Sequence, residues 1–257
     1  NQGLNFFDTE FEQFVRFESD ESNPNSLSNN QIRTIFEDSQ RQLWIGTSNG
    51  FCKFDRKKKI FENHYFDNSQ KTKTIINGIS EDANNNLWLA TEQNGLVKYD
   101  ISSEAFTYYK QNSQIEKSMP TNNVIRMLKD KSGILWLGSK TGLIRFDSKK
   151  RKFNLYRNAP NSEYTLPGND ITSILADIGE NIFIASRNEG ICVINRLKKT
   201  VKYFNTLYKR SPSDFVYYLA KTSNKEILAG TEYGVNVYSE KEEKFKPFFT
   251  NTICTNY

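Results

Sequence analysis

The chain has 257 residues and a formal net charge of +5, and 37% of its residues are apolar, 25% charged and 14% aromatic. The high aromatic content excludes a disordered chain, because disordered segments contain few aromatic residues. The mild positive charge permits anionic partners without requiring them. No run of 18 apolar residues occurs, so we expect no membrane-spanning helix. The first residue is Asn1, without a signal-peptide pattern, so we expect a mature or excised fragment.

The cysteines and the histidine exclude several kinds of site. Cys52, Cys192 and Cys254 form neither a disulfide framework nor a metal-ligand pattern. The single histidine, His64, excludes zinc sites that need several histidines, and we expect it on the surface of a strand. No Gly-rich phosphate loop or nucleophile elbow is visible. We therefore predict no cofactor, no metal site and no catalytic residues.

The first expected strands belong to a pattern that returns later in the chain. Gly3–Asp8 aligns with Gly50–Asp55, and Phe14 aligns with Phe61. Between these segments a longer unit begins, and its central motif occurs five times with steps of 44, 48, 47 and 45 residues. The copies are Leu43–Thr47, Leu87–Thr91, Leu135–Ser139, Ile182–Ser186 and Ile227–Thr231. The first three copies contain a tryptophan, whereas the last two do not.

Each unit predicts four short strands. In the first unit we expect them at 32–37, 43–47, 50–54 and 61–66, separated by polar or Gly turns. Four strands in about 45 residues are typical of a β-propeller blade. We therefore predict an all-β propeller of five full blades plus partial ones, either as a six-bladed ring with one incomplete blade or as a piece of a larger ring. The chain then forms one domain or fragment, with its units at 1–27 (partial), 28–70, 71–119, 120–167, 168–212, 213–250 and 251–257 (the start of the next blade).

The repeat resembles the two-component-regulator propeller repeat. The clearest copy runs from Asn123-Val124 to Asp130, then through Leu135–Ser139 and Gly142–Asp147. The last two units depart from the pattern, because they lack the tryptophan and have Asn195 or Ser239 in place of the closing Asp. The resemblance covers almost the whole chain.

The resemblance implies a function as well as a fold. In that family, tandem seven-bladed propellers form the periplasmic sensor region of hybrid histidine kinases in glycan-degrading gut bacteria. A β-sandwich, a membrane helix and kinase modules follow, and the chain shows none of them. The resemblance therefore implies that the chain is part of a seven-bladed ring. It also implies a periplasmic sensor fragment that binds an oligosaccharide and signals to the kinase. The implied partners are the rest of the parent kinase and a second copy in a homodimer. Nucleic acid and direct membrane contact are not expected.

The recurring aspartates have a structural interpretation. Asp38, Asp82, Asp130 and Asp177 stand six residues before each centre, so each belongs to a different blade. Copies in separate blades cannot meet at one active site, whereas an Asp in a turn can accept hydrogen bonds from its own backbone. We interpret Asp8, Asp55, Asp100, Asp147 and the Ser or Thr that ends each central motif in the same way.

Candidate ligand-binding residues lie on one face of the predicted propeller. The turns between the second and third strands and the connectors between blades share this face, and variable polar loops on a rigid frame often bind ligands. Sugars need planar hydrogen-bonding groups and aromatic rings. The candidates are Arg187, Asn188, Tyr233, Arg126, Tyr217, Glu92 and Lys140.

Two other functions stay open. A polysaccharide lyase or hydrolase would need a set such as Tyr233, Arg187 and Glu232, although the single histidine makes this less favoured. A protein-interaction scaffold would use the basic turns between third and fourth strands, which are otherwise explained by solubility. These turns contain Arg56–Lys59, Lys149–Lys152, and Arg196 with Lys198 and Lys199.

Overall fold

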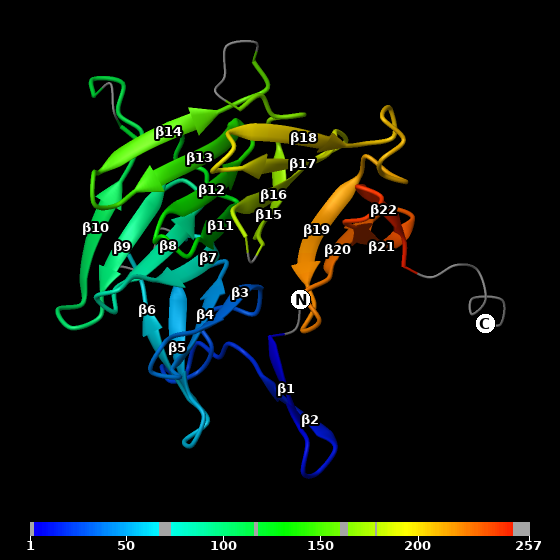
Figure 1. Cartoon of the computed structure of the whole chain (residues 1–257). Coiled ribbons are helices and arrows are strands. Elements are labelled where there is room, and N and C mark those ends of the chain that lie inside the picture. Colours follow the sequence, from blue (N-terminus) through cyan, green and yellow to red (C-terminus); the bar gives the residue numbers. More distant parts are fainter. Residues whose placement is uncertain (1–2, 67–72, 116–117, 160–163, 178, 249–257) are drawn as a thin grey trace. The chain divides into compact units, whose positions relative to one another are not determined.

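The computed structural model describes residues 3–66, 73–115, 118–159, 164–177 and 179–248. The chain divides into two compact units, residues 1–127 and 128–257. The described residues form 22 strands and no helix, and accordingly no helix that could cross a membrane (Figure 1). The strands make five four-stranded antiparallel sheets and one two-stranded sheet.

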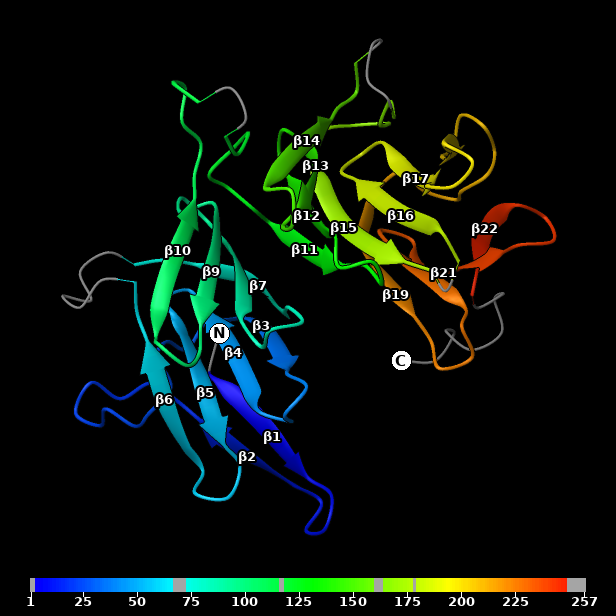
Figure 2. The same cartoon turned by 60° about the vertical axis from the view of Figure 1, so that its left-hand side comes forward.

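The first unit contains a hairpin and two four-stranded sheets, visible in Figure 2. The hairpin pairs β1 with β2, and each larger sheet is a meander in which neighbours in sequence pair with each other. The strands are β1 (Leu4–Asp8), β2 (Gln13–Phe17), β3 (Ile32–Glu37), β4 (Leu43–Thr47), β5 (Phe51–Asp55), β6 (Ile60–His64), β7 (Ile76–Glu81), β8 (Leu87–Thr91), β9 (Leu96–Asp100) and β10 (Ala105–Tyr109).

The second unit contains three four-stranded meanders, β11–β14, β15–β18 and β19–β22. The boundary between the two units falls within strand β11. The strands are β11 (Arg126–Lys129), β12 (Leu135–Ser139), β13 (Gly142–Asp147), β14 (Lys152–Tyr156), β15 (Ile171–Ala176), β16 (Asn181–Ser186), β17 (Gly190–Asn195), β18 (Thr200–Phe204), β19 (Val216–Lys221), β20 (Ile227–Thr231), β21 (Gly234–Ser239) and β22 (Lys244–Pro247).

The predicted fold class is confirmed: the protein is all-β, and each four-stranded sheet contains one copy of the repeat. The alignment of the N-terminal segment is also confirmed, because Phe7 pairs with Phe14 as Phe54 pairs with Phe61. The third strand of the first full blade begins one residue later than expected. Gly50 has a φ of 76° and belongs to the turn, where an added Cβ would lie 2.5 Å from the His64 carbonyl oxygen. The expected start of a next blade at 251–257 lies outside the described residues, and the seven-bladed ring stays a prediction.

The three tryptophans are core residues, as expected, and each is tied to the Asp of its own repeat. The indole Nε1 donates to the carboxylate six residues earlier, at 2.8 Å for Trp44–Asp38, 3.2 Å for Trp88–Asp82 and 2.8 Å for Trp136–Asp130. The other carboxylate oxygen accepts backbone N–H groups of the turn, as from Gln40 and Gln42 to Asp38. The turn role predicted for the aspartates is confirmed for Asp38, Asp82 and Asp130, and the bond to the tryptophan adds to it.

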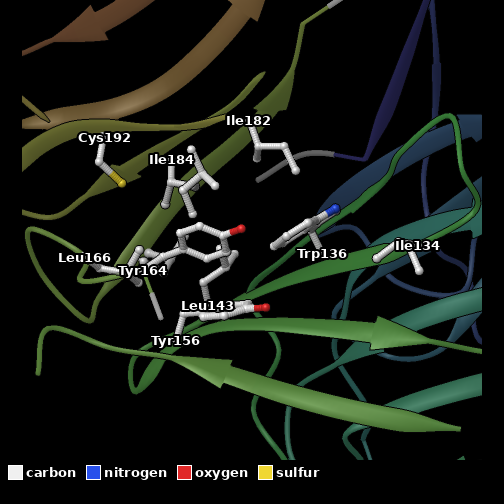
Figure 3. Close-up of a cluster of buried hydrophobic side chains, with 11 residues drawn as sticks. Ile134, Trp136, Leu143, Tyr156, Tyr164, Leu166, Ile182, Ile184 and Cys192 are labelled. Atoms are coloured by element: carbon white, nitrogen blue, oxygen red, sulfur yellow. The ribbon is translucent and has the colours of Figure 1, made fainter. Parts of the chain in front are cut away.

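Successive sheets pack face to face within each unit. One core cluster of the second unit joins Trp136 and Leu143 of the β11–β14 sheet with Ile182 and Ile184 of β16 (Figure 3). In the first unit, Trp44 and Phe51 pack with residues of β7 and β8 in the same way. The central strands β8 and β12 are buried at every position. This explains why these strands are apolar on successive residues rather than on alternate ones.

Most first strands contain a β-bulge that links one sheet to the next. The register shifts near the start of β3, β7, β15 and β19 and leaves one extra residue in each, such as Asn77 and Thr172. Asn77 Nδ2 donates to the carbonyl oxygen of Val124 at 2.9 Å, and Thr172 Oγ1 donates to that of Val216 at 2.7 Å. Val124 and Val216 occupy equivalent places in the following repeats. The bulge therefore aims a polar side chain at the next sheet.

The surface position predicted for His64 is wrong. Its side chain is only 11% exposed, stacks on Phe51 with ring centroids 5.1 Å apart, and lies 3.1 Å from the hydroxyl of Tyr99 through Nδ1. Burial lowers the pKa of His64, which favours the neutral ring. The strand pattern misplaced it because the fourth strand turns this side chain toward the next sheet. Cys52 and Cys192 are buried free thiols, as expected.

We expect Asp130→Asn to destabilise the protein by about 3–5 kcal/mol, because it leaves the charge of Arg196 without its buried partner. Asp130 is 3% exposed and accepts from Trp136 and, at 2.5 Å, from Arg196 Nη1. The matched variant Asp38→Asn breaks the same tryptophan contact without an arginine, so we expect a loss of about 1–3 kcal/mol. Guanidinium unfolding followed by tryptophan fluorescence measures both. Equal losses would contradict the role assigned to Arg196.

The stability contributed by Asp130 should depend on pH. Burial alone would raise the pKa of Asp130, but hydrogen bonds from Ser132 and Trp136 and the charge of Arg196 outweigh it and lower the pKa. A carboxyl whose pKa is lowered by folding stabilises the fold above its unfolded value, about 3.9, and loses this effect as the pH falls through the folded pKa. We expect the stability difference between wild type and Asp130→Asn to shrink below about pH 4. A stability difference that stays constant down to pH 2 would contradict the lowered pKa of Asp130.

Candidate functional site

A polar cleft of about 670 Å³ opens on the connector side of the first unit. Four segments form it: the β2–β3 connector, the β4–β5 turn, the chain just before β7, and the β8–β9 turn. We call this the connector cleft. Its lining residues are Ser19, Glu21, Asn29, Asn30, Gln31, Ser48, Lys73, Ile75, Glu92 and Gln93. Only one of the ten is apolar, so the cleft suits a ligand rich in hydrogen-bonding groups.

Asparagine side chains fix the shape of the β2–β3 connector. Asn30 Oδ1 accepts the backbone N–H of Ser19 at 2.7 Å, and Asn29 Oδ1 accepts that of Gln31 at 2.9 Å. The backbone carbonyl of Asn30 also accepts from the N–H of Gly3, which ties the connector to the start of β1. Asn is favoured in such loops because its side chain can replace a missing backbone partner. The connector is thus held in a defined conformation before any ligand binds.

A short hydrogen-bond network joins the connector to the β4–β5 turn. Ser48 Oγ donates to Gln31 Oε1 at 2.9 Å and accepts from Arg33 Nε at 2.9 Å. The backbone N–H of Ser48 also donates to the carbonyl oxygen of Gln31 at 3.0 Å. The bond to Gln31 Oε1 orients the Gln31 amide group and thereby its Nε2 donor. Pre-oriented polar groups lower the entropy lost when a ligand binds.

The β8–β9 turn presents two exposed side chains, Glu92 and Gln93, to the same cleft. The backbone N–H of Glu92 donates to the carbonyl oxygen of Ile75 at 3.0 Å, and that of Gln93 donates to Asn123 Oδ1 at 2.9 Å. Gln93 has a φ of 76°, in the left-handed region that most side chains avoid. The turn backbone is therefore held by the following repeat, while the two side chains remain available.

A second hollow of about 610 Å³ adjoins the connector cleft and shares Ser19, Glu21, Asn29 and Lys73 with it. Asn63 and Tyr65 line this second hollow. Asn63 Nδ2 donates to the carbonyl oxygens of Ser26 at 2.9 Å and Pro24 at 3.2 Å. Its Oδ1 atom is buried and has no hydrogen-bond partner among the described residues. A buried acceptor without a partner is costly, so a ligand hydroxyl that reached it would gain a strong contact.

The lining of the two hollows offers mainly hydrogen-bonding groups. Amide and hydroxyl groups predominate, with Glu21, Glu92 and Lys73 as the charged members of the connector cleft. Within the described part of the chain, no group of three His, Cys, Asp or Glu residues could hold a metal ion. The arrangement can bind a neutral polyhydroxylated molecule.

Of the seven residues predicted as ligand contacts, Glu92 lines the connector cleft and the other six do not. Arg126 also belongs to the first unit, where it is half-buried and its Nη1 donates to the carbonyl oxygen of Ile125 at 2.9 Å. The remaining five, all in the second unit, are Lys140, Arg187, Asn188, Tyr217 and Tyr233. They lie on turns or at a bulge, as expected, and Tyr233 and Tyr217 are 76% and 53% exposed. Their part in ligand binding stays a prediction.

Sequence reasoning missed most of the connector cleft. The first connector, between β2 and β3, contributes none of the seven predicted contacts. The signal was present in the sequence, because residues 18–31 contain many Asn and Ser residues and few apolar ones. Gln93 was missed for another reason: its conformation and its backbone partner in the next repeat cannot be deduced from local sequence.

The set suggested for an enzyme is already engaged in other contacts. Arg187 Nε donates to Asp170 Oδ2 at 2.8 Å, and Glu232 Oε1 accepts from Ser213 Oγ at 3.0 Å. Tyr233 extends outward and is largely exposed. The observed contacts hold the arginine and the glutamate in structural roles within the second unit.

Comparisons with known proteins identify the repeat. Residues 26–49 and 118–141 match the family model described as two component regulator propeller. A curated relative, histidine kinase P4 of Formosa agariphila, is 36% identical over 89 residues, which are 32% of this chain and 6% of that protein. The family resemblance predicted from the sequence is confirmed: two segments of the chain match the two-component-regulator propeller repeat.

Solved structures support the same fold. The extracellular domain of a hybrid two component system from B. thetaiotaomicron has a TM-score of 0.71 and 24% identity, and the match covers 85% of this chain and 30% of that one. A chain of the mitotic checkpoint complex has a TM-score of 0.66 at 10% identity, and the match covers 95% of this chain and 70% of that one. At these identities the likeness concerns the fold alone. The chain spans about a third of the extracellular domain that it matches.

We expect Gln93→Gly to change the free energy of unfolding by less than about 1 kcal/mol, because Gly adopts a positive φ without steric cost. Gln93→Val should lose about 1–2 kcal/mol, since a β-branched side chain fits this backbone poorly. Thermal and guanidinium unfolding of the two variants measures the difference. If both variants were equally stable, the strained backbone assigned to Gln93 would be wrong.

Proposed function

We propose that this chain, which carries two-component-regulator propeller repeats, is the ligand-binding part of a two-component signalling sensor. Its ligand is an oligosaccharide that binds in the connector cleft. The sensor part lies outside the cytoplasm, in the periplasm, and the rest of the parent protein carries the histidine kinase. The chain itself is not an enzyme in this proposal.

The observation that carries the proposal is the polar cleft built on rigid sheets. Amide groups of Asn29, Asn30 and Gln93 can each donate and accept hydrogen bonds, as pairs of sugar hydroxyls require. The low net charge of the lining favours a neutral sugar over a strongly ionic ligand. Tyr65, in the adjoining hollow, offers an aromatic ring of the kind that sugar rings contact.

Names of related proteins support the signalling part of the proposal. The curated relative is named a histidine kinase, and the solved structure is described as the extracellular domain of a hybrid two component system. Because these matches cover only part of either relative, kinase coupling and location remain proposals for this chain. A homodimer of the parent protein would bring two such sensors together.

The cleft suggests how binding would produce a signal. Its walls come from three successive repeats: the partial N-terminal one, the β3–β6 sheet and the β7–β10 sheet. A ligand that contacts all three favours the arrangement in which they fit it best. Binding of this kind shifts a conformational equilibrium by the difference in affinity for its two states. The kinase would respond to that shift.

Calorimetric titration with a panel of neutral oligosaccharides tests the proposal. We expect at least one oligosaccharide to bind and to raise the melting temperature. Gln93→Gly and Glu92→Gln should each lower its affinity by about tenfold, because each variant removes one or two hydrogen bonds. Glu10→Gln is the matched control, since Glu10 lies in the exposed β1–β2 turn. Its affinity should equal that of the wild type.

Analysis of the sugar after incubation separates a sensor from an enzyme. We expect the oligosaccharide to be recovered unchanged. Recovery of cleaved products that depend on the protein would contradict the assignment as a sensor. Full affinity in both Gln93→Gly and Glu92→Gln would show that the ligand binds elsewhere, and the turn residues Arg187, Asn188 and Tyr233 would then be the next set to vary.

A further inference from the structure

A third hollow, different in character from the two described above, lies in the second unit between the β11–β14 sheet and the β15–β18 sheet. It has a volume of about 410 Å³, and we call it the basic hollow. Four cationic side chains line it: Arg145, Lys150, Lys152 and Arg196. In the sequence, Lys150, Lys152 and Arg196 belong to two separate basic turns, whose charge was interpreted as serving solubility. The fold brings members of the two turns to one hollow.

The acidic residues of the basic hollow are already committed to other partners. Asp147 Oδ1 accepts the backbone N–H groups of Lys149 and Lys150, at 3.1 and 3.2 Å. Glu180 Oε2 forms an ion pair with Arg196 Nη2 at 2.6 Å. By contrast, the structure gives no ion pair between the side chains of Arg145, Lys150 or Lys152 and any residue that it describes. Asp147 keeps its negative charge in these bonds, but the four cations of the hollow outnumber its two acids, and three of the cations form no ion pair with a described residue.

Comparison with the first full blade shows how the charge arises. Lys53 occupies the place of Arg145 in the earlier repeat, beside the tryptophan strand. Its cross-strand neighbour is Glu62, and the two form an ion pair at 2.6 Å. In the β11–β14 sheet the corresponding neighbour of Arg145 is Asn154, which carries no charge. Lys98 of the second full repeat likewise faces an uncharged residue, Thr107, so the acid is particular to the first full blade. Arg145 differs from Lys98 in that basic turns converge beside it.

Arg196 gives the hollow a fixed cationic wall. Its Nη1 is bonded to Asp130 Oδ2 at 2.5 Å and its Nη2 to Glu180, so the guanidinium group is held from two sides. The remaining donor, Nε, is buried and has no hydrogen-bond partner among the described residues. A buried N–H without an acceptor is costly. An anion that entered the hollow could supply that acceptor.

The floor of the hollow is aromatic. Trp136, Tyr156 and Tyr164 line it together with Ile134, and Figure 3 shows these four side chains within the core cluster. The rings of Trp136 and Tyr156 are stacked with centroids 6.2 Å apart. Asn154, at the rim, adds an amide that can bind a hydroxyl group. Cations around an apolar floor suit a small molecule that has both a negative charge and a ring.

We propose that the basic hollow binds a small carboxylate-bearing sugar, at a site separate from the connector cleft. The carboxylate lies between Arg145 and Lys152, because a guanidinium group pairs with a carboxylate through two parallel hydrogen bonds. The sugar ring lies toward the floor, and Asn154 binds one of its hydroxyls. This inference does not depend on the neutral oligosaccharide proposed for the connector cleft.

Titration with galacturonic acid, galactose and sodium sulfate at low ionic strength tests the proposal. We expect galacturonate to bind with an affinity at least about tenfold higher than either galactose or sulfate, because only galacturonate combines the charge and the ring. Equal binding of sulfate and galacturonate would overturn the inference, since it would indicate general attraction to positive charge. Absence of galacturonate binding would overturn it as well.

Two variants locate the site. Asn154→Glu restores the cross-strand acid found at Glu62 and should form an ion pair with Arg145, so we expect about a tenfold loss of galacturonate affinity without loss of stability. Arg145→Lys keeps the positive charge but removes the guanidinium group that can form two parallel hydrogen bonds with a carboxylate, so we expect an intermediate affinity. Lys149→Ala is the matched control, because Lys149 lies in the same turn but does not line the hollow.

The control and the variants decide the outcome together. Melting temperatures close to that of the wild type show that Asn154→Glu and Lys149→Ala are folded. An affinity of Lys149→Ala within about twofold of the wild type, with a loss in Asn154→Glu, supports the site. Equal losses in both variants, or none in Asn154→Glu, would overturn it. Gln93→Gly should leave galacturonate binding unchanged, which separates this test from that of the connector cleft.

Discussion

The hydrogen bond from a tryptophan indole to the aspartate six residues earlier is the contact on which each of the first three repeats depends. A tryptophan fills a large part of a core, but its Nε1–H group needs a partner once it is buried. The aspartate supplies that partner with one oxygen and closes the turn between first and second strands with the other. One side chain therefore sets both the position of the core residue and the shape of the turn. The sheets that pack on Trp44 and Trp136 follow from this arrangement.

The later repeats show what happens when the tryptophan is lost. Phe183 replaces it in the fourth repeat, and Asp177, which has no indole to accept from, forms an ion pair with Lys221 at 3.0 Å. In the fifth repeat Leu228 replaces the tryptophan and Thr222 replaces the aspartate, and the Thr222 hydroxyl still accepts the N–H of Glu226. A phenylalanine or leucine has no polar group to satisfy. The aspartate can therefore bind another partner, as Asp177 does, or be replaced, as by Thr222. The Thr222 hydroxyl still closes the turn.

The repeat predicts the fold well because strand order and turn position are local properties. A period of about 45 residues, a Gly after the central motif and an Asp before it were enough to place the four-stranded sheets. Contacts between repeats were not predictable in this way. Arg196 meets Asp130, 66 residues earlier in the chain, and His64 is buried because Tyr99 of the next sheet packs on it. The connector cleft and the basic hollow also need contacts of this range, so the predicted site contained only Glu92 from the first and no residue from the second.

Both hollows are lined by segments whose sequence varies from one repeat to the next. The core positions are nearly the same from one repeat to the next, because each must fit between two neighbouring sheets. Connectors and outer strands have no such constraint, and there the repeats differ: a long Asn-rich connector precedes β3, and Asn154 stands where Glu62 compensates Lys53. A change at an outer strand alters the charge of a hollow without disturbing the Asp–Trp contact beneath it. This separation allows the same repeat to carry a polar cleft in one unit and a cationic hollow in the other.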